Sequence, residues 1–186
     1  VITFTDAGND FTGAAALNNS RANNVAVTDA NGINLGASSV GTGTLTVNGV
    51  GVTQSGAITQ AAAAGAATFN GGAGAITLTN GSNDFTGAVS LNNSVANNVA
   101  IADANVINLG TSNVGTGTLT VNGVGITQSG AITQAAAAGA ATFNGGAGVI
   151  TLTDAGNDFT GAVALNNSGA NNVAVTDANG INLGAS

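Results

Sequence analysis

Short runs of alternating apolar and polar residues recur along the whole chain. Leu119–Val121, Ile107–Leu109 and Ile76–Leu78 are typical, and clusters of Gly, Asn, Asp or Ser separate one run from the next. A period of two is that of a β-strand with one buried face, and Thr, Val and Ile favour strands. Gly and Asn tolerate the left-handed backbone that sharp corners need. The pattern therefore predicts many short strands joined by tight corners.

One run departs from this pattern. Four alanines, residues 61–64, follow Gln60 and precede Gly65. Alanine has the highest helix propensity, but a helix of this length is not stable by itself. We expect a corner or a thin strand here, with a short helix as the alternative.

The strands return at a fixed interval along the chain. Ile2–Thr5 recurs as Ile76–Thr79 and again as Ile150–Thr153, and residues 1–74 are identical to residues 75–148 at 60 of 74 positions. We therefore divide the chain into copy 1 (1–74), copy 2 (75–148) and a partial copy 3 (149–186), all in one continuous structure. Because copy 3 stops within the repeat and Val1 is not a start residue, we expect a longer array.

The copies also alternate. Over the 38 positions that all three share, copies 1 and 3 differ at three, whereas copies 1 and 2 differ at 12. Copy 2 carries Asn80, Gly81 and Ser82 where the other two copies carry Asp, Ala and Gly. The expected genetic unit is therefore a pair of repeats, such as positions 1–148.

These observations predict an all-β fold, a parallel β-helix (β-solenoid) in which coils stack about 4.8 Å apart. The strands of one repeat divide into three coils, with four as the alternative. A thin core of Val, Ile, Leu and Ala suits a chain with six Phe and no Trp or Tyr. Val47 and Val121 should point into this core, and Thr46 and Thr120 outward. An immunoglobulin-like sandwich built from each repeat fits less well, since the strands are short and Pro, Trp, Tyr and Cys are absent.

Charge excludes several classes of partner. The formal net charge is −7 and Arg21 is the only basic residue, so neither nucleic acid nor an anionic lipid surface is an expected partner. No run reaches the roughly 18–20 apolar residues of a membrane span, so we expect no membrane insertion. The absence of cysteine is compatible with export.

Two segments resemble a known family. Leu119–Ile132 and Ile150–Val163 are similar to the repeats of filamentous haemagglutinin-like exoproteins, large bacterial adhesins of two-partner secretion and autotransporter type. The resemblance is one of repeat style and extends over the whole chain. It implies a right-handed β-helix, export across the outer membrane, an extracellular or cell-surface location, and a role in adhesion or surface filaments.

Catalysis is not expected. His, Cys, Lys and Glu are absent, which removes most general bases and activated nucleophiles. Asp6 and Asp10 could form a carboxylate pair, but copy 2 replaces the first of them with Asn80. We expect no cofactor.

Calcium is the strongest metal hypothesis. Gly71–Gly74 is similar to the opening of the calcium-binding nonapeptide, but Ile76 stands where that motif needs Asp. Each Asn-Asp pair offers oxygen ligands, with Asp10, Asp84 and Asp158 as the candidates. Turn residues that bond their own backbone are the favoured interpretation.

Function is predicted from these points together. We expect a structural shaft or stalk of an extracellular bacterial surface adhesin or filament, which presents receptor-binding parts to a host cell or another cell. The alternative is a self-assembling extracellular fibre, joined end to end through exposed coil edges. A calcium-binding solenoid is less favoured because Ile76 replaces the Asp of the calcium motif. An ice-binding solenoid is less favoured because it would need Thr-x-Thr on the same side of every coil.

Overall fold

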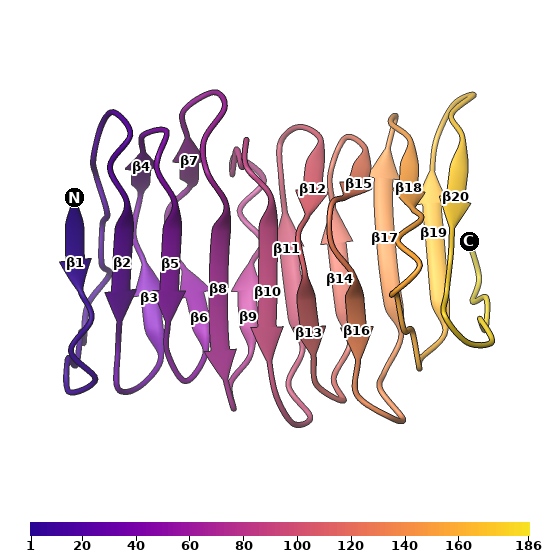
Figure 1. Ribbon diagram of the computed structural model, residues 1–186, viewed down its shortest axis with the longest axis horizontal. Coiled ribbons are helices and arrows are strands. Elements are labelled where there is room, and N and C mark those ends of the chain that lie inside the picture. Colours follow the sequence, from indigo (N-terminus) through magenta and orange to yellow (C-terminus); the bar gives the residue numbers. More distant parts are fainter.

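Parallel strands stacked into a continuous coil make up the computed structural model, which describes all residues 1–186 (Figure 1). Twenty strands are present and every strand pairing is parallel, with no helix between them. No segment therefore has the form of a membrane-crossing helix. The all-β solenoid expected from the sequence is confirmed.

The front sheet follows one face of the flattened coil and has 11 strands. Nine of them form its main ladder: β1 (Ile2–Phe4), β2 (Val25–Thr28), β5 (Leu45–Asn48), β8 (Ala67–Gly72), β10 (Val89–Asn93), β12 (Ile107–Leu109), β15 (Ile126–Gln128), β18 (Ile150–Leu152) and β20 (Val173–Val175). The other two, β13 (Ser112–Val114) and β16 (Ile132–Gln134), extend the rungs of β12 and β15.

The back sheet follows the opposite face and has seven strands. They are β3 (Ile33–Leu35), β6 (Val52–Gln54), β9 (Ile76–Leu78), β11 (Val99–Ala102), β14 (Leu119–Asn122), β17 (Ala141–Gly146) and β19 (Val163–Asn167). A separate pair, β4 (Ser38–Val40) and β7 (Ile58–Gln60), lies on the same face beside β3 and β6.

The coil is right-handed. In Figure 1 the near strands such as β2, β5 and β8 run downward while the far strands such as β3 and β17 run upward. The chain advances from left to right, so each turn follows the sense of a right-handed screw. This is the handedness that the resemblance to filamentous haemagglutinin-like repeats implies.

One repeat contains three and a half coils. Between β9 and β18, which are equivalent strands of successive copies, the chain crosses from one sheet to the other an odd number of times. It passes through β9, β10, β11, the β12–β13 pair, β14, the β15–β16 pair and β17, which are seven half-coils. The predicted values of three and four lie on either side of the observed one. The structural period is therefore two repeats, the same interval over which the sequence alternates.

A single hydrophobic column runs along the axis. Its 32 buried side chains alternate with outward ones along each strand. Val47 and Val121 are fully buried, while Thr46 and Thr120 are partly exposed, which confirms their predicted directions. Phe69 packs edge-on against Phe85, with ring centroids 5.7 Å apart, and the equivalent pair in the next repeat, Phe143 and Phe159, has the same spacing.

Corners set how closely the coils stack. The alanine run forms a turn and no helix, with Ala63 in the left-handed region at φ 58° and the amide of Ala64 bonded to the carbonyl of Ala61 at 3.1 Å. At another corner, a Cβ on Gly161 would overlap the carbonyl oxygen of Gly139 in the preceding coil. Only glycine allows the two backbones to approach this closely.

Candidate functional site

Outward-facing asparagines form a hydrogen-bonded ladder on the front sheet. The Nδ2 of Asn70 donates to Oδ1 of Asn48 at 2.7 Å, and the Nδ2 of Asn92 donates to Oδ1 of Asn70 at 3.0 Å. Asn48 continues the ladder to the hydroxyl of Thr28 at 3.1 Å. Each amide both donates and accepts, so identical residues on neighbouring coils can satisfy one another.

The same ladder recurs on the back sheet in copy 2. Asn144 donates to Asn122 at 2.8 Å, and Asn166 donates to Asn144 at 2.9 Å. The ladder of copy 2 lies on the opposite face because each repeat ends half a coil further round the axis than it began. Both faces of the solenoid therefore carry a line of neutral amides.

A surface depression lies beside the front ladder. Its lining consists entirely of asparagine and glycine: Asn70, Gly72, Asn92, Asn93 and Asn113. It lies on β10, which pairs with β8 along one edge and with the two short strands β12 and β13 along the other. The exposed side chain of Asn113 forms no hydrogen bond within the chain, although its backbone N–H donates to Oδ1 of Asn92 at 3.1 Å. The depression offers neutral donors and acceptors and no titratable group.

A second set of amides lies inside the coil. Asn83 is fully buried, and its Oδ1 accepts from the backbone N–H of Ile58 at 2.9 Å and from Nε2 of Gln54 at 2.8 Å. Its Nδ2 donates to the carbonyls of Leu78 and Ala102, each at 3.1 Å, and to Oε1 of Gln54 at 2.9 Å. These partners belong to three consecutive rungs of the back face, built on β6, β9 and β11. Asn83 therefore links three coils through one side chain.

The arrangement recurs one repeat later, and its position in copy 1, Asn9, lies in the first coil of the sequence. Asn157 is also fully buried and makes the same five hydrogen bonds. Asn9 contacts only its own turn and the following coil, through the carbonyls of Phe4 and Thr28 at 3.2 Å each. The sequence predicts turns at the Asn-Asp pairs and does not predict this role for Asn83. The only signal available was that an Asn occupies this position in all three copies.

Another feature shared by the copies is an aspartate that binds backbone across coils. In copy 2, Asp103 accepts from the N–H of Phe85 in the preceding coil and from the N–H of Asn105, each at 2.7 Å. Burial raises the pKa of Asp103, the two backbone N–H groups oppose that rise, and the nearby charge of Asp84 adds to it. Asp29 and Asp177 make the same kind of contact, to Phe11 and Phe159.

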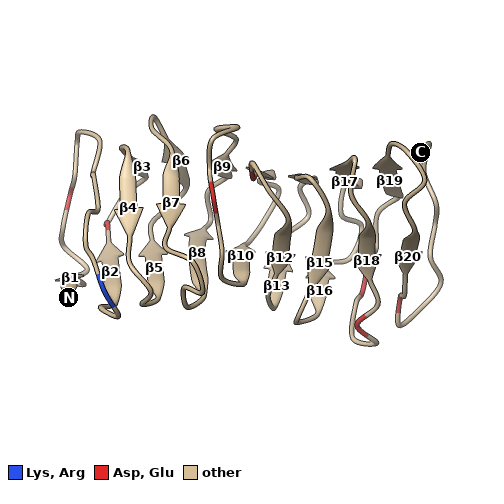
Figure 2. Cartoon of the chain, turned by 90° about the horizontal axis from the view of Figure 1, so that it is seen from above, with Lys and Arg blue, Asp and Glu red and all other residues tan.

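The three calcium candidates lie apart on separate copies. Asp10 is exposed, Asp84 accepts from Nδ2 of Asn105 at 3.3 Å, and Asp158 accepts from Nδ2 of Asn179 at 3.2 Å. No group of three or more acidic, His or Cys side chains comes together. Figure 2 shows the charged residues thinly spread along the solenoid. Asp84 and Asp158 thus each accept from one neutral amide, and Asp84 also lies near the carboxylate of Asp103.

Fold and surface together define a repeat β-solenoid of the kind found in structural repeat proteins, with a thin continuous core and neutral amides outside. The chain belongs to a family described as repeats of unknown function (DUF5649), whose model matches residues 22–92 and 96–166. Ala22 and Ala96, where the two matches start, occupy the same position in successive repeats. No curated protein and no solved structure matches the chain.

Proposed function

We propose that the chain is a rigid shaft segment of an extracellular bacterial surface protein, which extends and presents other parts of that protein. The observation that carries this proposal is that pairing continues unbroken across the repeat boundary at residues 74 and 75. There β8 of copy 1 pairs with β10 of copy 2 over five residue pairs, and β6 of copy 1 pairs with β9 of copy 2 over two. No hinge or linker separates the copies, so adding a repeat lengthens the solenoid without adding a joint.

The geometry sets the increment of length. Three and a half coils per repeat, at a spacing of about 4.8 Å, correspond to about 17 Å per repeat. Each coil contacts only its neighbours, so stability is approximately a sum over coils and does not limit the length of the array. Such a body is suited to spanning distance.

The extracellular and adhesive parts of the proposal rest on other grounds. They draw on the resemblance of Leu119–Ile132 and Ile150–Val163 to filamentous haemagglutinin-like repeats, on the absence of cysteine and on the scarcity of charge. The absence of His, Cys, Lys and Glu supports a role without catalysis. Receptors on other cells are the proposed partners of the whole protein.

Solution scattering on chains with increasing numbers of repeats tests the shaft. We expect the maximum dimension to grow by about 17 Å per repeat at a constant cross-section. A maximum dimension that grows with protein concentration at fixed repeat number would favour the end-to-end fibre instead. Separate beads or a compact particle would refute the rod. Labelling intact cells with an antibody to the repeat, with and without surface protease, tests the extracellular location.

The depression beside the front ladder favours a second candidate function, a contact site for an uncharged, hydroxyl-rich ligand such as a neutral glycan. Its lining consists of amides and backbone, which donate to and accept from hydroxyl groups, and Asn113 has its side chain free. Titration of neutral oligosaccharides by NMR should shift the signals of Asn92 and Asn113, and Asn113→Ala should abolish those shifts. Asn34→Ala, on the outer surface of β3, is the control. Uniform shifts over the whole surface would exclude this site.

A metal-independent shaft is also part of the proposal. Since no three acidic side chains come together at Asp10, Asp84 or Asp158, a chelator should leave the melting temperature unchanged. A rise in melting temperature with added calcium would contradict this, because a ligand that binds only the folded state must stabilise it.

A further inference from the structure

The chain contains the Asn-Gly dipeptide seven times, in very different surroundings. The seven asparagines are Asn31, Asn48, Asn70, Asn80, Asn122, Asn144 and Asn179. In this dipeptide the backbone nitrogen of glycine can attack the asparagine side chain, since no Cβ obstructs its approach. Whether it does so depends on how the fold holds the two groups.

Four of these pairs are held in the ladders. The side chains of Asn48 and Asn70 bond to each other at 2.7 Å, as those of Asn122 and Asn144 do at 2.8 Å. The amide of Gly49 is also engaged, since it donates to the carbonyl of Asn70 at 3.0 Å. In these pairs the strand pairing keeps the backbone extended and the side-chain amide occupied.

Asn80 stands in an exposed turn with the opposite properties. The N–H of Gly81 forms no hydrogen bond, the residue is exposed, and a Cβ built on it would meet nothing within 4 Å. The Oδ1 of Asn80 accepts from the N–H of Ser82 at 2.9 Å. This bond folds the side chain back over the Gly81 amide, and it polarises the carbonyl that would be attacked. The Nδ2 of Asn80 donates no hydrogen bond, so ammonia can leave freely.

The other two pairs lack this combination. The Oδ1 of Asn31 accepts no hydrogen bond, and a Cβ on Gly32 would lie 3.3 Å from the carbonyl oxygen of Val50. The Nδ2 of Asn179 is held by Asp158 at 3.2 Å. Asn80 alone has a free neighbouring amide together with a polarised side-chain carbonyl.

We propose that Asn80 is a site of spontaneous covalent modification, at which the backbone nitrogen of Gly81 displaces the side-chain amide and converts the residue to aspartate. The Gly81 nitrogen loses its proton to solvent and forms a bond to Cγ of Asn80. The amide nitrogen then leaves as ammonia, giving a five-membered succinimide. Water adds to one ring carbonyl and opens the ring to aspartate or isoaspartate. The net reaction consumes one water and releases one ammonia, with no oxidation or reduction.

The fold already accepts the aspartate product. Copies 1 and 3 carry Asp6 and Asp154 at this position, and their Oδ1 atoms accept from the N–H of Gly8 and of Gly156, each at 2.8 Å. The turn therefore has the same hydrogen bond before and after the reaction. The modification adds one negative charge and makes this turn of copy 2 chemically like that of its neighbours.

Ageing of the folded chain at mildly alkaline pH, followed by unfolding, digestion and tandem mass spectrometry, measures all seven pairs in one sample. We expect Asn80 to convert at least about tenfold faster than the four ladder asparagines, because one oxyanion donor can contribute that much or more. It should also exceed Asn31 and Asn179. Equal rates at all seven, or a faster reaction at Asn31 or Asn179, would overturn the proposal.

Two controls separate structure from local sequence. In denaturant the seven pairs should react at similar rates, and if Asn80 remained the fastest there, the folded turn would not be the cause. Gly81→Ala should slow conversion at Asn80 and preserve the fold, since copies 1 and 3 carry Ala7 and Ala155 at this position. Unchanged conversion in this variant would also refute the mechanism.

Discussion

Leu45 and Leu119 occupy the same position in consecutive repeats, but β5 places Leu45 in the front sheet and β14 places Leu119 in the back sheet. Both side chains are buried in the same column, which they enter from opposite sides. The relationship follows from the extra half-coil in each repeat. Each copy is therefore rotated by half a turn about the solenoid axis relative to the copy before it.

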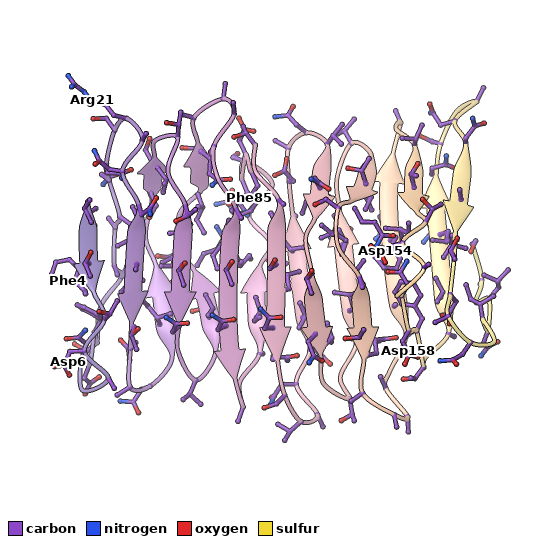
Figure 3. All side chains as sticks on the ribbon, viewed as in Figure 1. Phe4, Asp6, Arg21, Phe85, Asp154 and Asp158 are labelled. Carbon is purple, nitrogen blue, oxygen red and sulfur yellow. The ribbon has the colours of Figure 1, made fainter.

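This half-turn gives a physical reason why the sequence of copy 2 differs from those of copies 1 and 3. Copies 1 and 3 have the same orientation about the axis and differ at three of 38 shared positions. Copy 2, which is rotated by half a turn, differs from copy 1 at 12 of them. A residue type that must stay on one edge of the solenoid has to recur every second repeat. Figure 3 shows Phe85 of copy 2 toward the upper edge, whereas Asp158, which directly precedes the equivalent Phe159 of copy 3, lies toward the lower one.

The direction of side chains on β14 gives the first prediction. Val121→Asp places an unpaired carboxylate in the column and should cost several kcal/mol. Thr120→Asp lies on the outer surface and should cost less than about 1 kcal/mol. Hydrogen exchange should show the damage of Val121→Asp confined to nearby coils, since distant coils share no contacts. Greater damage from Thr120→Asp would mean that the two directions are reversed.

The buried amide of Asn83 gives the second. Asn83→Ala removes five hydrogen bonds, including those to the buried N–H of Ile58 and to the carbonyls of Leu78 and Ala102, and it should cost about 3 kcal/mol or more. Asn9→Ala is the matched control, because its side chain has two hydrogen bonds instead of five and should cost about 1 kcal/mol. Chemical denaturation measures both. Equal losses would mean that the link between three coils adds nothing.

Close backbone contact at the corners gives the third. A methyl group on Gly161 would overlap the carbonyl of Gly139, so Gly161→Ala must push two coils apart and should cost about 1–3 kcal/mol. Gly81→Ala, where nothing lies within 4 Å of the added atom, should be nearly neutral. Thermal melts of the two variants decide the matter. If Gly161→Ala melts at the same temperature as the native chain, the two coils can move apart at this corner with little loss of stability.

The raised pKa of Asp103 gives the fourth. Because the folded chain holds this proton more tightly than the unfolded chain, the carboxyl contributes most to stability below the unfolded pKa of about 3.9. That contribution is lost as the pH rises through the raised pKa of the folded state. The melting temperature of the native chain relative to Asp103→Asn should therefore fall as the pH is raised over this window.

A second measurement tests the cause of the shift. Asp84→Asn removes a neighbouring negative charge and should lower the pKa of Asp103, as read from the carboxyl carbon by NMR. If the melting difference rises with pH, or if Asp84→Asn raises the pKa, the assigned environment of Asp103 is wrong.

Several features could be predicted from the sequence because they depend on local pattern or on identity between copies. Period-two alternation determined that Val121 points inward and Thr120 outward, and identity between copies determined the presence of the repeat. The lack of helix-length apolar patterns determined the all-β class.

The number of coils depended on the tertiary structure. The number of coils per repeat is set by the length of each corner. Corner lengths range from three residues, 49–51, to ten residues, 79–88. Turn composition predicts that a corner exists but not where the next strand regains register with the coil below. A shift of half a coil per repeat leaves the local pattern unchanged and moves every strand to the opposite face.

The different roles of Asn83 and Asp84 also depend on the tertiary structure. The two residues are adjacent in a dipeptide that is typical of turns, and the sequence contains no sign that they differ. In the coil, Asp84 bridges to Thr59 of the preceding rung and keeps its side chain partly exposed, while the side chain of Asn83 lies fully inside. The partners of Asn83 lie up to 29 residues away, on the coils before and after it. Only the stacking of those coils brings them within hydrogen-bonding distance.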